Sequence, residues 1–293
     1  MIIRQEMHAA ARRGAQRLKD PAATAGFLRG HWLDDGGFAD RSGKSDLYYT
    51  VFGLQASAAL DIAPPVERVG AYVESFGRGE GLDLVHAACL VRCRALLPGA
   101  LPDDDVRDAL VRRVEAHRAA DGGYARQVGQ PAGTAYGCFL ALAALQDLAA
   151  PLPEADEVAG CLASLASGDG AYANSRDLPI GSVPATAAAV SALHHLARPA
   201  TPEAPSWLLA RHSATGGFVP VPGAHHADLL STATALHALS LLEADLSGIR
   251  RACLRFVRSL QRPGGGFAGH ADDPTPDGEY TYYALLALGH LEA

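Results

Sequence analysis

The chain has few cysteines, few aromatic residues and no excess of basic charge over its 293 residues. Its 25 lysines and arginines are outnumbered by 32 acidic residues, so it lacks the basic surface that binding to nucleic acid requires. The five cysteines are odd in number and form no CxxC pair, which favours reduced and buried thiols. We therefore expect a cytoplasmic protein that does not bind nucleic acid.

Long hydrophobic runs are also missing. The longest one without a charge, residues 132–145, is too short to span a bilayer, and the N-terminal residues carry charges every few positions, unlike a signal peptide. Apolar residues nevertheless make up 48% of the chain, enough for a full-sized core. The composition predicts a soluble protein with no membrane span and excludes a disordered chain.

The sequence does contain an internal repeat. Residues 27–38 read FLRGHWLDDGGF and residues 256–267 read FVRSLQRPGGGF, with related copies at 113–124, 161–172 and 207–218 and a weaker one ending at Leu82. Each copy precedes an apolar stretch rich in Ala and Leu, at residues 46–60, 83–96, 130–145, 182–196, 228–242 and 277–291. These stretches are too long for strands, so each unit predicts an amphipathic outer helix, a Gly-Gly-aromatic turn and an apolar inner helix.

The two terminal repeats match the middle ones, whereas an open solenoid needs atypical polar caps at its ends. This similarity predicts a closed ring in which the last repeat packs on the first. We therefore predict an all-α fold, an α/α toroid of six helix pairs (an α6/α6 barrel), in one domain over residues 1–293. Small residues within the inner segments are expected to let neighbouring inner helices approach closely: Gly53, Gly137, Ala189, Ala235 and Ala284.

The segment GGFADRSGKSDLYYTVFGL at residues 36–54 combines a Gly-Gly-Phe turn with a D-x-x-Y-T helix start. Together with the other turns and helix starts, it resembles the prenyltransferase/squalene-cyclase repeat of protein prenyltransferase β subunits and class II terpenoid cyclases, over residues 22–293. The resemblance implies an isoprenoid or other hydrophobic substrate in a cavity at the N-terminal ends of the inner helices. It leaves open whether a helical partner subunit is needed.

The transferase branch of this family implies a zinc site made of an Asp and a Cys from a D-x-C-Y motif and a His from the following repeat. Asp46 and His86 stand at matching positions, but Tyr48 stands where the cysteine would be. Because the thiolate ligand is missing, we expect no bound metal and no other cofactor. Zinc is the metal whose absence should be tested. The cyclase branch implies a D-x-D-D acid at an inner-helix start. The acidic run at residues 103–105 instead precedes an outer helix, where it is expected to cap that helix.

Two cations stand in the turn before the first inner segment. Arg41 and Lys44 precede Asp46, and paired cations near a helix N-terminus are suited to bind a diphosphate. With this resemblance, Asp46, Tyr49 and His86 are the candidate catalytic residues near the reacting carbon. The competing interpretation is that Arg41 and Lys44 are solvated loop charges.

Polar and aromatic residues of the inner segments complete the candidate site. Residues four positions before a recurrent Thr or Ala are expected to be helix N-caps: Asp46, Asp83, Ser182, Asp228 and Asp277. Residues five positions after it form a column expected to face the cavity: Gln55, Arg92, Phe139, Ser191, His237 and Leu286. Tyrosines suited to line an isoprenoid chain or stabilise a developing cation are Tyr48, Tyr49, Tyr136, Tyr280 and Tyr283. The predicted substrate-binding set is Arg41, Lys44, Tyr48, Gln55, Arg92, Tyr136, His237, Tyr280 and Tyr283.

Three functions remain open on the sequence. The first hypothesis is a prenyltransferase-like enzyme that binds a prenyl diphosphate in the ring. The second is a terpenoid cyclase-like enzyme that protonates an alkene with an inner-helix acid outside a D-x-D-D motif. The third is a non-catalytic toroid that holds a lipid or a peptide. A glycosidase barrel is disfavoured, because aromatic residues make up only 6% of the chain.

Overall fold

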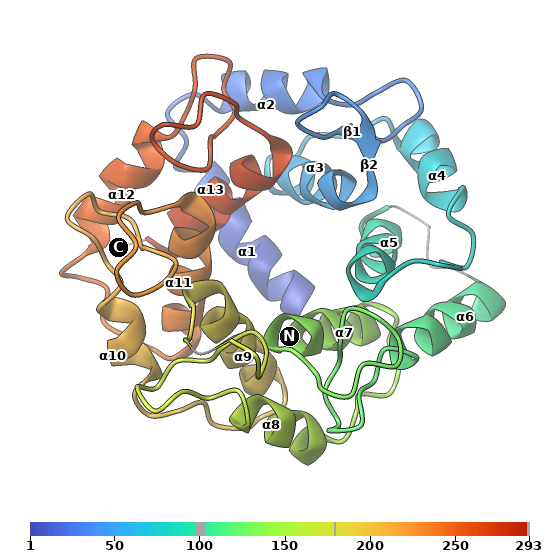
Figure 1. Cartoon of the computed structure of the whole chain (residues 1–293). Helices are drawn as coiled ribbons and strands as arrows, with labels where there is room; N and C mark the ends of the chain where they lie inside the picture. Colours follow the sequence, from blue (N-terminus) through green and yellow to red (C-terminus); the bar gives the residue numbers. More distant parts are fainter. Residues whose placement is uncertain (98–102, 179, 292–293) are drawn as a thin grey trace.

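The computed structural model describes residues 1–97, 103–178 and 180–291. Its helices form two concentric rings (Figure 1). The inner ring consists of α3 (Leu47–Ala59), α5 (Leu84–Leu96), α7 (Ala135–Asp147), α9 (Val183–His195), α11 (Leu229–Leu241) and α13 (Gly278–His290). The outer ring consists of α2 (Pro21–Gly30), α4 (Val66–Glu74), α6 (Asp104–Glu115), α8 (Ala155–Ala163), α10 (Ala204–Leu209) and α12 (Arg250–Ser259). The predicted toroid of six helix pairs is confirmed.

The last repeat closes the ring against the first. Helix α13 lies beside α3, and the Tyr48 hydroxyl donates to Glu279 Oε1 across this contact at 2.6 Å. The rings of Phe52 and Tyr282 also pack there, with their centroids 5.8 Å apart. The predicted adjacency of residues 46–60 and 277–291 is confirmed, and the terminal repeats cover each other.

A polar N-cap fixes the start of every inner helix. Five caps are those expected from the sequence, and each accepts the backbone N–H three residues ahead: Asp46, Asp83, Ser182, Asp228 and Asp277. The sixth cap is Thr134, so α7 begins at Ala135 rather than at residue 130. Aligning Thr134 with Thr50 is therefore wrong, because Thr50 lies one turn inside α3. The misalignment amounts to about one helical turn. Residues one turn apart share a face of the helix, so Phe139 still points inward.

The Gly-Gly-aromatic turns bury their aromatic side chains, which are 0–2% exposed: Phe38, Tyr124, Tyr172, Phe218 and Phe267. In four repeats the backbone N–H of this residue donates to a threonine hydroxyl of the inner helix: Thr50, Thr186, Thr232 and Thr281. A Cβ added at Gly53 would lie 2.3 Å from the Phe38 ring, and one at Gly137 would lie 2.1 Å from the Tyr124 carbonyl oxygen. At these two glycines the close neighbour is the turn and not an adjacent inner helix, which corrects that expectation.

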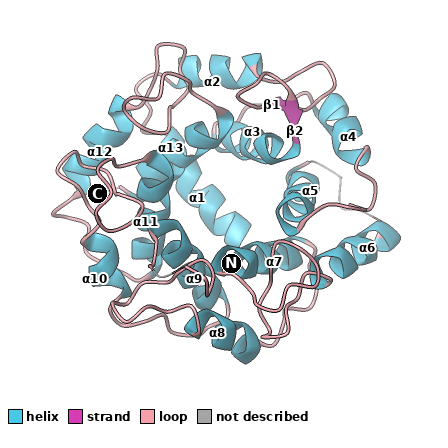
Figure 2. Ribbon diagram, in the orientation of Figure 1, coloured by secondary structure: helices cyan, strands magenta, loops and turns pink. Residues whose placement is uncertain are grey.

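A helix that the repeat pattern does not predict, α1 (Ile3–Ala15), lies across the ring (Figure 2). It contacts the C-terminal halves of inner helices: Arg4 pairs with Asp147 of α7 at 2.8 Å. A Cβ at Gly14 would lie 1.8 Å from the Leu285 carbonyl oxygen, and Gly289 approaches the α1 backbone equally closely. The two glycines bring α1 and α13 into backbone contact. Helix α1 thereby closes the ring at the C-terminal ends of the inner helices.

Two expectations from composition also have a structural outcome. Within the part of the chain that the structure describes, no helix combines the length and the apolar character that a membrane crossing requires. All five cysteines are free thiols and are buried, as expected. Burial raises the pKa of Cys89 to about 12, so that this thiol stays protonated at neutral pH.

Candidate functional site

A cavity of about 450 Å³ lies inside the inner ring, and a smaller one of about 100 Å³ adjoins it. Three layers of inner-helix residues line them. The second residues of the helices form the upper layer: Tyr48, Val85, Tyr136, Pro184, Leu230 and Glu279. The sixth residues form the middle layer: Phe52, Cys89, Leu140, Ala188, Thr234 and Tyr283. The ninth residues form the lower layer: Gln55, Arg92, Ala143, Ser191, His237 and Leu286. This spacing follows one face of each helix.

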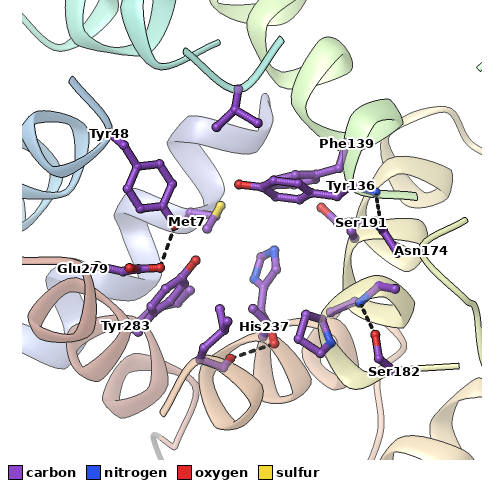
Figure 3. Close-up of a pocket in the computed structure, with 18 of the residues that line it drawn as sticks. Met7, Tyr48, Tyr136, Phe139, Asn174, Ser182, Ser191, His237, Glu279 and Tyr283 are labelled. Atoms are coloured by element: carbon purple, nitrogen blue, oxygen red, sulfur yellow. Dashed lines mark hydrogen bonds between the residues drawn. The ribbon is translucent and has the colours of Figure 1, made fainter. Parts of the chain in front are cut away.

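Glu279 is the one charged residue of the upper layer. It projects from the first turn of α13 into the cavity, beside Tyr283, where its carboxylate accepts the hydrogen bond from Tyr48 (Figure 3). Burial raises the pKa of Glu279 to about 7; the hydrogen bond from Tyr48 opposes this rise, and the negative charge of Asp277 adds to it. A largely apolar cavity therefore contains a carboxyl group that is partly protonated near neutral pH and can donate its proton.

Aromatic rings form much of the cavity wall. Three of the predicted tyrosines line it: Tyr48, Tyr136 and Tyr283. Tyr136 stacks on Phe139, with ring centroids 6.4 Å apart. Tyr49 and Tyr280 do not line the cavities, and the Tyr280 ring lies instead 5.3 Å from the guanidinium carbon of Arg41. The wall suits an unsaturated hydrocarbon chain, because its π faces also attract a cation.

The lower layer carries polar groups on two sides of the ring. Gln55 of α3 accepts a hydrogen bond from Arg92 of α5 at 3.0 Å, and Arg92 also pairs with Asp147. Ser191 and His237 lie across the ring on α9 and α11. All six residues of the predicted inward column line one of the two cavities, with Phe139 one turn nearer the upper layer than its counterparts.

A cluster of histidines meets Glu6 of α1 below the cavity. His237 Nε2 lies 3.5 Å from Glu6 Oε1, and His195 Nε2 lies 3.3 Å from Glu6 Oε2. His237 Nδ1 lies 3.1 Å from His290 Nε2. Burial lowers the pKa of His237 to about 4, although Glu6 opposes this shift, and burial also lowers the pKa of His290. At neutral pH these two imidazoles are therefore uncharged hydrogen-bonding groups.

Arg41 lies in the turn between β1 (Phe38–Ala39) and β2 (Ser45–Asp46), outside the lining of both cavities. Its guanidinium donates to Asp277 at 2.6 Å and to Asp273 at 2.7 Å. Burial alone would lower the pKa of Arg41, but the two carboxylates outweigh it and raise the pKa. Arg41 therefore ties the first repeat to the last, and its charge is compensated.

Lys44, the other predicted cation, is exposed and forms no ion pair with any residue that the structure describes. A different arginine, Arg126, lines the larger cavity and pairs with Asp83 at 2.8 Å. Asn174 lies beside this region and accepts the backbone N–H of Tyr136 at 3.0 Å. The cation that lines the larger cavity is therefore contributed by a later turn than that of Arg41 and Lys44.

The residues that match the zinc positions of the family make other contacts in the structure. Asp46 caps α3 by accepting the N–H of Tyr49, and the Tyr48 hydroxyl points to Glu279. His86 Nδ1 lies 2.7 Å from Asp83, whose pKa is lowered to about 2 because hydrogen bonds from His86 and Arg126 outweigh burial. Among the described residues, no three His, Cys, Asp or Glu side chains are grouped to hold a metal ion. The absence of zinc stays a prediction.

Sequence reasoning did not select Glu279. The acidic run at residues 103–105 lies at the start of outer helix α6, where Asp103 accepts the N–H of Val106, as expected of a cap. The signal for Glu279 was available: it is the one acid at the second position of an inner helix, where the other repeats have Tyr, Val, Pro or Leu. The signal depends on knowing that this position faces the cavity.

Comparison with known proteins identifies the fold family. A profile of the prenyltransferase alpha-alpha toroid domain matches residues 11–89, 84–196 and 185–293. A search of curated proteins finds no match by sequence.

Several solved structures share the fold at low sequence identity. Protein geranylgeranyltransferase-I of Candida albicans, complexed with GGPP, superposes with a TM-score of 0.63 and 13% identity, over 82% of this chain and 81% of that one. The type II terpene cyclase MstE of Scytonema, in complex with geranylgeranyl dihydroxybenzoate, superposes with a TM-score of 0.62 and 14% identity, over 99% of this chain and 98% of that one. A protein from Actinoplanes superposes with a TM-score of 0.60 and 19% identity, over 97% of this chain and 98% of that one.

Proposed function

Because the chain belongs to the prenyltransferase alpha-alpha toroid family, we propose that its central cavity binds an isoprenoid chain and that Glu279 protonates a double bond of that chain, as in a terpenoid cyclase. The observation that carries this proposal is an acid with a pKa of about 7 at the start of an inner helix, facing an aromatic-lined cavity. It is the inner-helix acid that the second sequence hypothesis requires.

The proposed reaction begins with transfer of the Glu279 proton to one carbon of a terminal double bond. A C–H bond forms, the adjacent carbon becomes a cation, and Glu279 becomes a carboxylate that Tyr48 stabilises through its hydrogen bond. The next double bond supplies the electron pair that closes a C–C bond and moves the cation along the chain. The final cation loses a proton to water, and Glu279 regains one from solvent. Rings such as Tyr136 and Tyr283 stabilise the cation, by about 2 kcal/mol for a desolvated contact.

The size of the cavity limits the substrate. At the ~30 Å³ that a water-sized group occupies in a liquid, a cavity of about 450 Å³ holds about 15 non-hydrogen atoms. This volume fits a folded chain of three isoprene units. Longer chains would need the adjoining cavity, which shares Met7, Tyr48 and Tyr283 with the larger one.

Incubation in D₂O tests the proposal directly. Farnesol, geranylgeraniol and their diphosphates are each incubated with the protein, and products are analysed by mass spectrometry. We expect a cyclic product that gains one deuterium at carbon, because the proton of Glu279 comes from solvent. The Glu279→Gln variant keeps the shape of the side chain without the acid and should lose the product. Binding without turnover by the wild type would instead support the non-catalytic toroid.

A prenyltransferase is the second candidate, favoured by the position of Arg126 at the cavity and by the likeness to a geranylgeranyltransferase solved with GGPP. It predicts release of diphosphate without deuterium at carbon. If Arg41 and Lys44 form its diphosphate clamp, replacing both by Ala should weaken binding of a prenyl diphosphate at least tenfold and leave binding of the alcohol unchanged. Equal affinities of the double variant and the wild type would refute that clamp.

A further inference from the structure

Two buried polar atoms near the lower end of the cavity lack a hydrogen-bond partner among the described residues, although one of them, His237 Nε2, lies 3.5 Å from Glu6 Oε1. Ser191 Oγ and His237 Nε2 belong to neighbouring inner helices, and their residues are 1% and 5% exposed. Neither atom has a hydrogen-bond partner in the part of the chain that the structure describes. Both side chains project into the larger cavity (Figure 3). Because an unsatisfied buried polar group is costly, the pair indicates a bound group that satisfies it.

The surroundings determine which chemical group fits. Glu6 lies 3.5 Å from His237 Nε2, so a negative group bound there would be repelled. The carboxylate also favours the tautomer with its proton on Nε2, which leaves Nδ1 of His237 to accept from His290. In this tautomer His237 Nε2–H is a donor that lies 3.5 Å from Glu6 Oε1 but forms no hydrogen bond with it in the described part of the chain, so an oxygen atom in the cavity can accept from it. The Ser191 hydroxyl both donates and accepts. A hydroxyl group in the cavity can accept from His237 and donate to Ser191 Oγ, whereas an ether oxygen can accept but offers Ser191 Oγ no donor.

We propose that Ser191 and His237 bind the hydroxyl group of a prenyl alcohol, an inference that rests on the proposed binding of an isoprenoid chain. Ser191 and His237 are the ninth residues of their helices, whereas Glu279 is the second residue of α13. The rise of 1.5 Å per residue places the two levels about 10 Å apart. The alcohol therefore lies with its hydroxyl at the lower end and its far double bonds near the acid. This assigns an uncharged alcohol of about fifteen carbons, and not a diphosphate, as the substrate.

Calorimetric titration of the full chain with three compounds tests this site: farnesol, farnesyl methyl ether and farnesyl diphosphate. The wild type should bind farnesol about three- to tenfold more tightly than the ether, the effect of one net hydrogen bond between neutral groups. Ser191→Ala should lose most of this preference, whereas His237→Phe should weaken binding of the alcohol and of the ether alike. Ser57→Ala is the matched control, because Ser57 is also buried without a described hydroxyl partner but lines neither cavity. It should keep the preference.

The outcomes separate this inference from the proposed function. If the wild type binds none of the three compounds, the isoprenoid proposal itself fails. If the alcohol and the ether bind but Ser191→Ala leaves the ratio of their affinities unchanged, or His237→Phe weakens the binding of neither, only the hydroxyl site is refuted. Tighter binding of the diphosphate than of the alcohol also overturns it. Thermal unfolding of each variant verifies that the substitution has left the fold intact.

Discussion

Replacing Tyr48 by Phe should raise the pKa of Glu279. The hydroxyl donates to Glu279 Oε1 at 2.6 Å and stabilises the charged carboxylate more than the neutral acid. A hydrogen bond to a charged group contributes about 1.5–3 kcal/mol, and one pH unit corresponds to about 1.4 kcal/mol. We therefore expect Tyr48→Phe to raise the pKa from about 7 by about one to two units.

The titration can be followed without knowing the substrate. Protein labelled with ¹³C at the glutamate carboxyl carbon is titrated by NMR, and the Glu279→Gln variant identifies the resonance. Tyr49→Phe is the matched control, because the Tyr49 hydroxyl forms no hydrogen bond with Glu279 in the described part of the chain, although its ring contacts Tyr48. If Glu279 of the wild type titrates near pH 4.5, the proposed effect of burial on its pKa is refuted. A pKa that stays constant or falls in Tyr48→Phe would refute the role assigned to the hydrogen bond.

The raised pKa also has a consequence for stability. Between about pH 4.5 and 7 the folded chain retains a proton on Glu279 that the unfolded chain has released, so the free energy of unfolding should fall as pH rises through this window. The contribution is fully present below pH 4.5. Denaturant unfolding across this range should show a smaller pH slope in Glu279→Gln. Any cyclase activity should fall above about pH 7, and this limb should move upward in Tyr48→Phe.

Two further predictions concern the fold and the metal. Gly53→Ala should lower the free energy of unfolding by about 1–3 kcal/mol, because its Cβ would lie 2.3 Å from the Phe38 ring. Gly70→Ala, in α4 with open space around it, should instead raise the free energy of unfolding by up to about 1 kcal/mol. A denaturant series that ranks the two variants otherwise contradicts this prediction. The purified protein should carry no stoichiometric zinc by elemental analysis, and one zinc per chain that is lost on replacing Asp46 or His86 would show this to be wrong.

The architecture was predictable because it is encoded locally and repeatedly. Each turn needs the same glycines and a buried aromatic residue such as Phe38, and each inner helix needs a polar cap such as Asp46, so the pattern recurs along the chain. Closure followed from the likeness of the end repeats. The register failed only in the third repeat, where the recurrent threonine is the cap itself: Thr134 precedes α7, whereas Thr50 lies inside α3.

The candidate site was predictable only as far as helix periodicity reaches. The sequence by itself determined the repeat unit, five of the six caps and an inward column that includes Gln55 and His237, since these depend on contacts within one repeat, and it indicated ring closure through the likeness of the end repeats. Only the tertiary structure decided what those groups meet. Arg41 is paired by two aspartates of the last repeat, and Glu279 acquires its raised pKa from burial in the assembled ring. Charge compensation and desolvation depend on residues more than 200 positions apart, which no local pattern records.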